Sequence, residues 1–316
     1  RLVTARSRPH LCCSKLLPAA SPSSHRHTAW RQRRPGRLSF SIARFIQQHP
    51  LRYLLEIQLT TIQYLTLIDT LARFHLRGEA RQFYLGYFWW LLEPALYIAV
   101  FYAVFQLLLD SRQPDYLYFL AVGKLTFIWF SKSVVQASSS IETNKGLISQ
   151  VTISKEVFPL AAVQQGLYRQ LAVFSFLLVL LFLSGKGQFH YWFWLLPLMF
   201  VQMILISGVG LLAALAVCWH KDFQHLIQLG MMFLLFVSGV FWDVNAVADA
   251  DLRRWLLLLN PLAALIDAYR QILLLGSLPK AGVMSVLLCQ SLFLLAIAVG
   301  AYRIFHSRIA LRVLSR

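Results

Sequence analysis

Charged residues are scarce in this chain. They make up 14% of its 316 residues, against 58% that are hydrophobic, whereas a soluble globular domain is about 25% charged and about 45–50% apolar. A mean hydropathy of +0.59 points the same way. This composition excludes a strictly soluble enzyme and a disordered chain, so membrane-spanning segments are the first feature to look for.

Cysteine is also scarce, and the four that occur have no informative spacing. Cys12 and Cys13 are adjacent, Cys218 ends an apolar run and Cys289 lies inside another. This pattern matches neither a disulfide framework nor paired metal-binding motifs. We therefore expect no structural disulfide and no metal site.

Sequence motifs for hydrolysis are missing as well. The nearest approach to a phosphate-binding P-loop is Gly123-Lys124-Leu125, but Tyr118 stands where the first Gly belongs and Leu125 where Ser or Thr is required. The motifs His-Glu-x-x-His and Gly-x-Ser-x-Gly do not occur either. We therefore expect no catalytic residue, and ATP-driven transport would need an ATPase on a separate chain.

Acidic residues are absent before Glu56, where the charged side chains are all Arg or Lys. Residues 1–38 are rich in Ser, Pro and Arg, which predicts a disordered basic tail. The tail resembles a transit peptide, but translated upstream sequence that is not native is the simpler interpretation. The net charge of +17 is concentrated there. Because the aromatic residues lie within or beside apolar runs, we expect no nucleic-acid partner.

The rest of the chain has the pattern of membrane helices. Residues 39–84 combine helical periodicity with frequent charges, which predicts an amphipathic helix on the cytoplasmic membrane surface. Six apolar runs follow, each about long enough to cross a ~30 Å hydrocarbon core. They are Trp89–Leu109, Tyr116–Val135, Phe158–Ser184, Tyr191–Trp219, Leu226–Trp242 and Gly282–Ile304. The predicted fold is therefore an all-α membrane protein with six transmembrane helices within residues 85–316.

The segment between the last two runs, about residues 246–276, does not fit a plain loop. Asn260-Pro261 divides it into two short apolar stretches, and the second contains Asp267 and Arg270. Because Asn-Pro favours a turn and Pro breaks a helix, we expect two short re-entrant helices on the outer side. Arg and Lys flank the first and last runs, which places both termini in the cytoplasm by the positive-inside rule.

Charges within the runs are candidate functional residues, because a charge at the centre of a membrane helix costs at least ~2.5–3.5 kcal/mol. Glu93 precedes Pro94 in the first run, and Lys124 and Lys132 lie in the half-polar second run. Two interpretations of Lys124 remain open: it meets an anionic group of a passing substrate, or it pairs with a carboxylate such as Glu93 or a loop Asp. We expect Lys132 to extend to the membrane interface.

Four motifs carry a family resemblance. They are Leu85–Pro94 at the entry to the first run, Ile141–Ile148 with Lys155, Glu156 and Pro159, Ser238–Trp242, and Leu259–Arg270. In this order the motifs resemble the membrane subunit, or permease, of ABC type-2 polysaccharide exporters, which transport O-antigen, capsule and teichoic acid. Two residues depart from the family pattern: Gly239 stands where Pro is common, and Glu79 interrupts a cluster that is usually more basic.

The resemblance implies a transport subunit of the bacterial inner membrane that is not itself an enzyme. It implies a homodimer, a cytoplasmic ABC ATPase subunit that binds MgATP, and a polyprenyl- or lipid-linked glycan as substrate. No cofactor is expected in this chain. Residues of about 141–157 are implied to form the coupling helix that transmits motion from the ATPase: Glu142, Asn144, Lys145, Leu147, Ile148, Lys155 and Glu156.

The remaining candidate residues fall into three groups. Flat aromatic faces and charges near the first two runs suit a sliding sugar polymer: Tyr87, Trp89, Trp90, Glu93, Tyr97 and Lys124. Arg77 and Arg81 suit the phosphates of a lipid carrier, and Asn260, Pro261, Asp267 and Arg270 belong to the re-entrant region. The aromatic residues also fit an interfacial belt, and the basic ones fit ordinary membrane lipid.

Two other functions remain open from the sequence. The first is an ABC type-2 exporter of a non-glycan lipid or small amphiphile. The second is a membrane scaffold without transport, which would not need Lys124 or the half-polar second run. A membrane-embedded transferase or protease is disfavoured, because the runs contain isolated charges rather than a catalytic constellation.

Overall fold

The computed structural model describes residues 61–82, 84–104, 115–150, 153–185 and 189–314. The predicted tail, residues 39–60 of the predicted surface helix and the end of the first run at 105–109 lie outside these ranges. Within them, every regular element is a helix. The helices are α2 (Thr61–Gln82), η2 (Gly86–Phe88), α3 (Trp89–Tyr102), α4 (Tyr116–Thr143), α5 (Lys145–Gln150), α6 (Val157–Leu183), η4 (Phe189–Trp194), α7 (Leu195–Trp219), α8 (Asp222–Val237), η5 (Val244–Ala246), α9 (Ala250–Leu259), α10 (Pro261–Arg270), η6 (Gln271–Leu275) and α11 (Ala281–Leu314).

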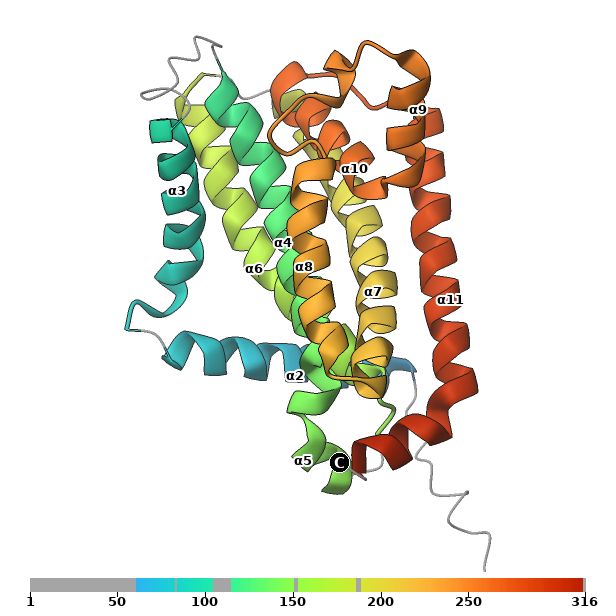
Figure 1. Ribbon diagram of the computed structural model, residues 1–316. Helices are drawn as coiled ribbons and strands as arrows, with labels where there is room; N and C mark the ends of the chain where they lie inside the picture. Colours follow the sequence, from blue (N-terminus) through green and yellow to red (C-terminus); the bar gives the residue numbers. More distant parts are fainter. Residues whose placement is uncertain (1–60, 83, 105–114, 151–152, 186–188, 315–316) are drawn as a thin grey trace, which may run out of the picture. The chain divides into compact units, whose positions relative to one another are not determined.

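Helix α4 is the centre of the bundle (Figure 1). It packs against α6 and α7, and α11 packs along α7. Small residues allow these helices to approach closely, as is common between membrane helices. Gly208 of α7 lies directly against the backbone of α11, and Gly210 lies against Ala137 of α4. Helices α2 and α5 lie at one end of the bundle, called here the α5 end, and α9 and α10 lie at the opposite α9 end.

Four helical segments are long and apolar enough to cross a membrane: α4, α6, Phe189–Trp219 and Ala281–Phe305. Two bent pairs raise this number to six if each pair is one span: α2 with the segment Gly86–Val100, at 96°, and α9 with Pro261–Leu275, at 104°. The all-α membrane class is confirmed. The fifth predicted run, Leu226–Trp242, is wrong at both ends, because α8 begins at Asp222 and ends at Val237. Gly239 at φ +68° then turns the chain.

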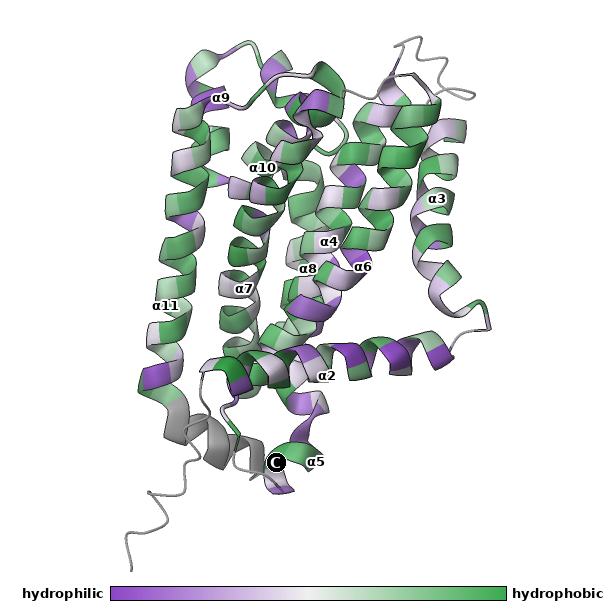
Figure 2. Cartoon of the chain, turned by 180° about the vertical axis from the view of Figure 1, so that it is seen from behind, coloured by the Kyte–Doolittle hydropathy of each residue, from purple (hydrophilic) through white to green (hydrophobic). Residues whose placement is uncertain are grey.

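Helix α2 is amphipathic in the described part, and Figure 2 shows hydrophilic residues recurring along it. Its buried residues Ile68, Ala72 and Ala80 are an apolar stripe, and α2 packs against α6. Tyr168 of α6 donates a hydrogen bond to Asp69, which also pairs with Arg73 at 2.9 Å. These contacts attach α2 along the α5 end of the bundle. Its position on a membrane surface stays a prediction.

Asn260 shapes the break between α9 and α10. Its side-chain oxygen accepts hydrogen bonds from the backbone N–H groups of Leu262 and Ala263, at 3.1 and 3.2 Å. Its side-chain amide donates to the Ser238 hydroxyl at 3.0 Å. Pro261 occupies the first turn of α10, where its missing N–H leaves no hydrogen bond unmade. The cap therefore satisfies backbone N–H groups at the start of α10 and connects the bend to Ser238, directly after α8.

Arg270 completes this attachment from the other end of α10. Only 4% of the residue is exposed, and its guanidinium donates to the carbonyls of Gly239 and Val240, at 2.8 Å each, and to that of Phe119 at 3.3 Å. It also lies 3.4 Å from the centre of the Phe119 ring. A Cβ at position 123 would stand 2.5 Å from the guanidinium, so Gly123 is required there. The chain turn after α8 is thereby held to α4.

Replacing Gly208 by Ala tests the close contact between α7 and α11. An added Cβ would lie 2.8 Å from the backbone nitrogen of Leu295, and backbone cannot move as a flexible side chain can. We expect a loss of about 1–3 kcal/mol in stability, measured as thermal unfolding of the purified protein. Gly300→Ala is the control, because a Cβ at that position in α11 meets nothing within 4 Å. Equal melting temperatures for the two variants would contradict the packing.

Candidate functional site

The aromatic residues proposed for a substrate pathway lie on η2 and on α3. Tyr87 and Tyr97 are 53% and 42% exposed, whereas Trp89 and Trp90 are half-buried. The rings of Tyr87 and Trp90 meet edge to face with centres 4.9 Å apart. The helix therefore presents aromatic surface outward along much of its length while Trp90 turns toward the bundle.

Glu93 forms an ion pair with Lys132 of α4, with 2.5 Å between the ammonium nitrogen and the carboxylate oxygens. The side chains are 26% and 41% exposed, respectively. The structure thus pairs Glu93 with Lys132 rather than with Lys124, and the extension of Lys132 to the membrane interface stays a prediction. Lys132 lies two helical turns closer to the α5 end than Lys124, which brings it level with Glu93.

Lys124 lies instead beside Tyr97 of α3. Its ammonium nitrogen is 5.3 Å from the centre of the Tyr97 ring, within the range of a cation–π interaction. Lys124 and Tyr97 were both assigned to the substrate pathway, and the structure brings them together. Neither lines the pocket that contains Trp90 and Glu93.

A closed ring of four polar side chains connects α2, α4 and α6. Arg169 binds Glu79 at 3.2 Å and Gln136 at 3.0 Å. Gln136 donates to Gln165 at 2.7 Å, and Gln165 donates to Glu79 at 2.8 Å. Each side chain binds the next, and such connected networks are how polar groups are tolerated in a low-dielectric interior. Glu79, which interrupts the basic cluster of α2, thus anchors that helix to the bundle.

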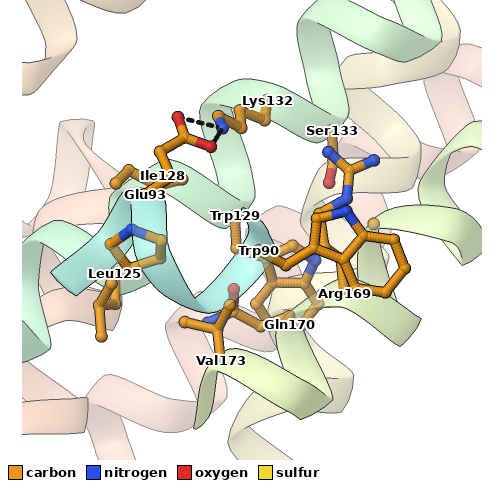
Figure 3. Close-up of a pocket in the computed structure, with 12 residues that line it drawn as sticks. Trp90, Glu93, Leu125, Ile128, Trp129, Lys132, Ser133, Arg169, Gln170 and Val173 are labelled. Atoms are coloured by element: carbon orange, nitrogen blue, oxygen red, sulfur yellow. Dashed lines mark hydrogen bonds and ion pairs between the residues drawn. The ribbon is translucent and has the colours of Figure 1, made fainter. Parts of the chain in front are cut away.

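A pocket lies between α3, α4 and α6, beside this ring (Figure 3). Trp90 and Glu93 of α3 face Trp129 and Lys132 of α4, and Gln170 lies across the cavity from the Glu93–Lys132 pair. The cavity has a volume of about 30 Å³. Three buried donors, Trp129 Nε1, Arg169 Nε and Gln170 Nε2, have no acceptor among the described residues. The pocket is therefore apolar in its walls and rich in N–H groups.

Sequence reasoning missed Trp129, Arg169 and Gln170. The signal was available, because Gln164-Gln-Gly-Leu-Tyr-Arg-Gln170 is a polar stretch inside the third apolar run. A charge within a span is a functional candidate, and Arg169 should have been included on that ground.

The two carrier-binding candidates, Arg77 and Arg81, are exposed on α2. They lie on the same helix as Glu79, whose carboxylate is taken by Arg169. Their side chains are therefore presented at the α5 end without being drawn into the polar ring. Their binding of a lipid phosphate stays a prediction.

The predicted coupling segment, 141–157, is one short helix with flanking turns. Helix α4 continues to Thr143, α5 contains only Lys145–Gln150, and α6 begins at Val157. Leu147 and Ile148 pack against a buried cluster that includes Ile141 and Phe158. A short helix, α5, therefore lies inside the predicted segment and packs on the bundle by its apolar side; its coupling role stays a prediction.

The charged members of this segment differ in their contacts. Glu142 pairs with Lys221 of the link between α7 and α8 at 2.6 Å, and the Asn144 side chain forms a hydrogen bond with His75 of α2. Lys145, Lys155 and Glu156 are half-exposed. Two polar contacts therefore connect the α5 end of α4 and the turn after it to α2 and to the link between α7 and α8.

Several known proteins are similar in sequence to this chain. Residues 66–274 match the family described as ABC-2 type transporter. An O-antigen export system permease protein RfbA of Myxococcus xanthus is 30% identical over 248 residues, which cover 78% of this chain and 94% of that protein. A protein of the same name from Klebsiella pneumoniae is 26% identical over 61% of this chain and 74% of its own length. A polysialic acid transport protein KpsM of Escherichia coli is 24% identical over 78% and 94%.

A double-mutant cycle tests the Glu93–Lys132 pair. Glu93→Gln or Lys132→Met alone leaves the partner charge unpaired, and we expect each to lower stability by about 1–2 kcal/mol because the pair is only partly buried. The double variant removes both charges and should recover most of the loss. Thermal unfolding of the four proteins measures the coupling. Additive losses would show that the two side chains act independently.

A second test follows from the pKa of His75. Burial lowers this pKa below the ordinary value of 6.5, and the hydrogen bond with Asn144 opposes the shift. As the pH falls below 6.5, the unfolded chain is protonated first, so stability is lost until the folded protein is protonated too. We expect the melting temperature to fall more steeply from about pH 7 to about pH 5.5 in the wild type than in His75→Gln. The exposed-site variant His225→Gln should keep the wild-type slope; a wild-type slope in His75→Gln would contradict the argument.

Proposed function

Because the chain belongs to the ABC-2 type transporter family, we propose that it is the membrane-spanning subunit of an ATP-driven polysaccharide exporter. It would move a lipid-linked glycan from the cytoplasmic side across the bacterial inner membrane. The observation that carries the proposal is its similarity to O-antigen and polysialic acid transport proteins over most of their length. The relatives are transport subunits, so ATP hydrolysis belongs to a separate cytoplasmic ATPase.

We infer a six-span topology in which α3, α4, α6, α7, α8 and α11 cross the membrane. Helix α2 would lie on the cytoplasmic surface, and α9 and α10 would form a re-entrant pair at the outer side. The exposed basic residues of α2 support this orientation, because Arg and Lys are enriched on the cytoplasmic side. The 104° bend between α9 and α10 supports the re-entrant pair. Both termini are then cytoplasmic.

The working unit we propose contains two copies of this chain and two ATPase subunits that bind MgATP. ATP binding would close the ATPase dimer, and α5, seated in a groove of the ATPase, would transmit that motion. Two contacts support this route. Leu147 and Ile148 join α5 to the buried cluster at the ends of α4 and α6, and the Glu142–Lys221 pair links α4 to the start of α8. A displacement of α5 therefore acts on several spans.

The glycan would pass along α3, where Tyr87 and Tyr97 are exposed. Aromatic faces contact the CH groups of sugars without fixing one register, as a sliding polymer requires. Arg77 and Arg81 on α2 would bind the phosphates of the lipid carrier at the cytoplasmic surface. Deleting the gene should abolish surface polysaccharide and cause lipid-linked glycan to accumulate inside the cell. Normal surface glycan with loss of another envelope lipid would favour a non-glycan exporter instead.

A substitution on the exposed face of α5 tests the coupling assignment. Gly146 is exposed, and a Cβ there meets nothing within 4 Å, so Gly146→Trp should leave this subunit folded. We expect the variant to insert normally and to lose co-purification of the ATPase in mild detergent, because the indole would block the contact. In a strain without the gene it should restore less than about a tenth of the surface glycan, which corresponds to a loss of about 1.4 kcal/mol in binding. Gly282→Trp is the control, since Gly282 is equally open and lies near the start of α11. Wild-type export by Gly146→Trp would remove α5 from the coupling route.

A further inference from the structure

The pocket between α3, α4 and α6 contains donors that the described protein does not satisfy. Trp129 and Gln170 are only 3% and 4% exposed, yet Trp129 Nε1 and Gln170 Nε2 have no acceptor among the described residues. Arg169 Nε is also buried without an acceptor among the described residues. Buried donors are paired in the large majority of native proteins, with protein, water or ligand. The three N–H groups therefore point to an oxygen-bearing occupant.

The charge balance decides which kind of oxygen fits. Lys132 is paired with Glu93, and Arg169 is paired with Glu79. Both cations that line the pocket are therefore neutralised before any ligand enters. A phosphate or carboxylate would add an unpaired charge to an apolar site, which is unfavourable. A neutral acceptor such as a hydroxyl group avoids that cost.

The shape of the pocket restricts the occupant further. A cavity of about 30 Å³ admits a small group or an ordered water, but not a whole sugar ring. Its walls include the Trp90 and Trp129 indoles and the apolar side chains of Leu125, Ile128 and Val173. Trp90 is half-buried and contacts Tyr87, so part of its ring faces outward. If the hydroxymethyl group of a sugar entered the cavity, the sugar ring would lie against this aromatic surface.

We propose that this pocket is a subsite for a neutral hexose unit of the exported glycan, a role that rests on the proposed function. The exocyclic hydroxyl of the sugar enters the cavity and accepts hydrogen bonds from Trp129 Nε1 and Gln170 Nε2. The ring lies on the outward part of Trp90. The Glu93–Lys132 pair borders the site and keeps it electrically neutral. The subsite thus binds one sugar unit at a time beside the aromatic face of α3.

Saturation-transfer NMR on the full chain in lipid nanodiscs tests the subsite. The probes are methyl β-glucoside and methyl β-xyloside, which differ because the xyloside lacks the hydroxymethyl arm, and inorganic phosphate serves as a competitor. We expect the glucoside to bind the wild type, the xyloside to bind several-fold more weakly, and phosphate not to compete. Trp129→Phe and Gln170→Met should each weaken glucoside binding about three- to tenfold, as expected for one lost hydrogen bond.

Matched controls separate this site from general effects of losing a buried donor. Trp192 Nε1 is also buried without an acceptor in the described part of the chain, but Trp192 does not line the pocket, so Trp192→Phe should bind glucoside normally. Trp129→Phe keeps the aromatic ring that meets Phe174 edge to face. Thermal unfolding of each variant confirms that it is folded before binding is compared.

The outcomes distinguish the subsite from the transport function. Three outcomes would overturn the subsite and identify a cavity that holds water only. They are no binding of the glucoside, unchanged glucoside binding in both pocket variants, and equal binding of the xyloside. Competition by phosphate would overturn its preference for a neutral ligand. In any of these cases, loss of surface glycan on gene deletion still supports export. Surface glycan that is independent of the gene would reject export, whatever the NMR result.

Discussion

A backbone N–H or C=O group within hydrocarbon has to find its partner inside the protein. The consequence is most visible where helical hydrogen bonding stops, at the bend between α9 and α10. There the Asn260 side chain caps the new helix, and the Arg270 guanidinium takes the carbonyls left open after α8. These two side chains replace the missing helical turns. These backbone groups at the bend therefore find their partners inside the protein.

The same constraint governs the ionised side chains. Glu79 binds Arg169 and Glu93 binds Lys132, so each carboxylate of α2 or α3 meets a cation of the central helices. These contacts differ from the apolar packing that joins α4, α6 and α7. The Glu93–Lys132 pair is only partly buried, so we expect it to hold α3 less firmly than apolar packing holds the core helices.

The sequence predicted the helical class and most of the spans, because long apolar runs leave little choice of structure. It also predicted a break at Asn260-Pro261, which follows from the chemistry of those two residues. It misplaced the end of α8, because Val237 and Phe241 are equally apolar and only the turn at Gly239 distinguishes them. It left open whether Glu93 pairs with Lys124, whereas the structure pairs Glu93 with Lys132. Lys124 and Lys132 lie on one helix two turns apart, and the choice between them depends on the vertical register of α3 against α4.

The polar ring and the pocket could not be predicted for a related reason. Gln136, Gln165 and Arg169 come from helices whose relative rotation is set by packing along their whole length. A sequence identifies a polar residue in a span, but not the side chain it meets. The unpaired N–H groups of Trp129 and Gln170 are even harder to predict from sequence, since a donor lacks an acceptor only when none of the surrounding residues supplies one. The fold class can therefore be predicted from the composition of the chain, whereas the site depends on how the helices are rotated and aligned against one another.

A pathway for a long polymer has to bind each unit weakly, because a site that holds one sugar firmly stalls every unit behind it. The subsite that we propose beside α3 would meet this requirement through its electrostatics. Since Lys132 and Arg169 are neutralised by their own carboxylates, neither offers a full charge to a ligand. The two neutral hydrogen bonds from Trp129 and Gln170, each with a net value of about 0.5–1.5 kcal/mol, would favour one orientation of a sugar but allow it to leave. An unpaired arginine in the same place would bind more tightly and transport less.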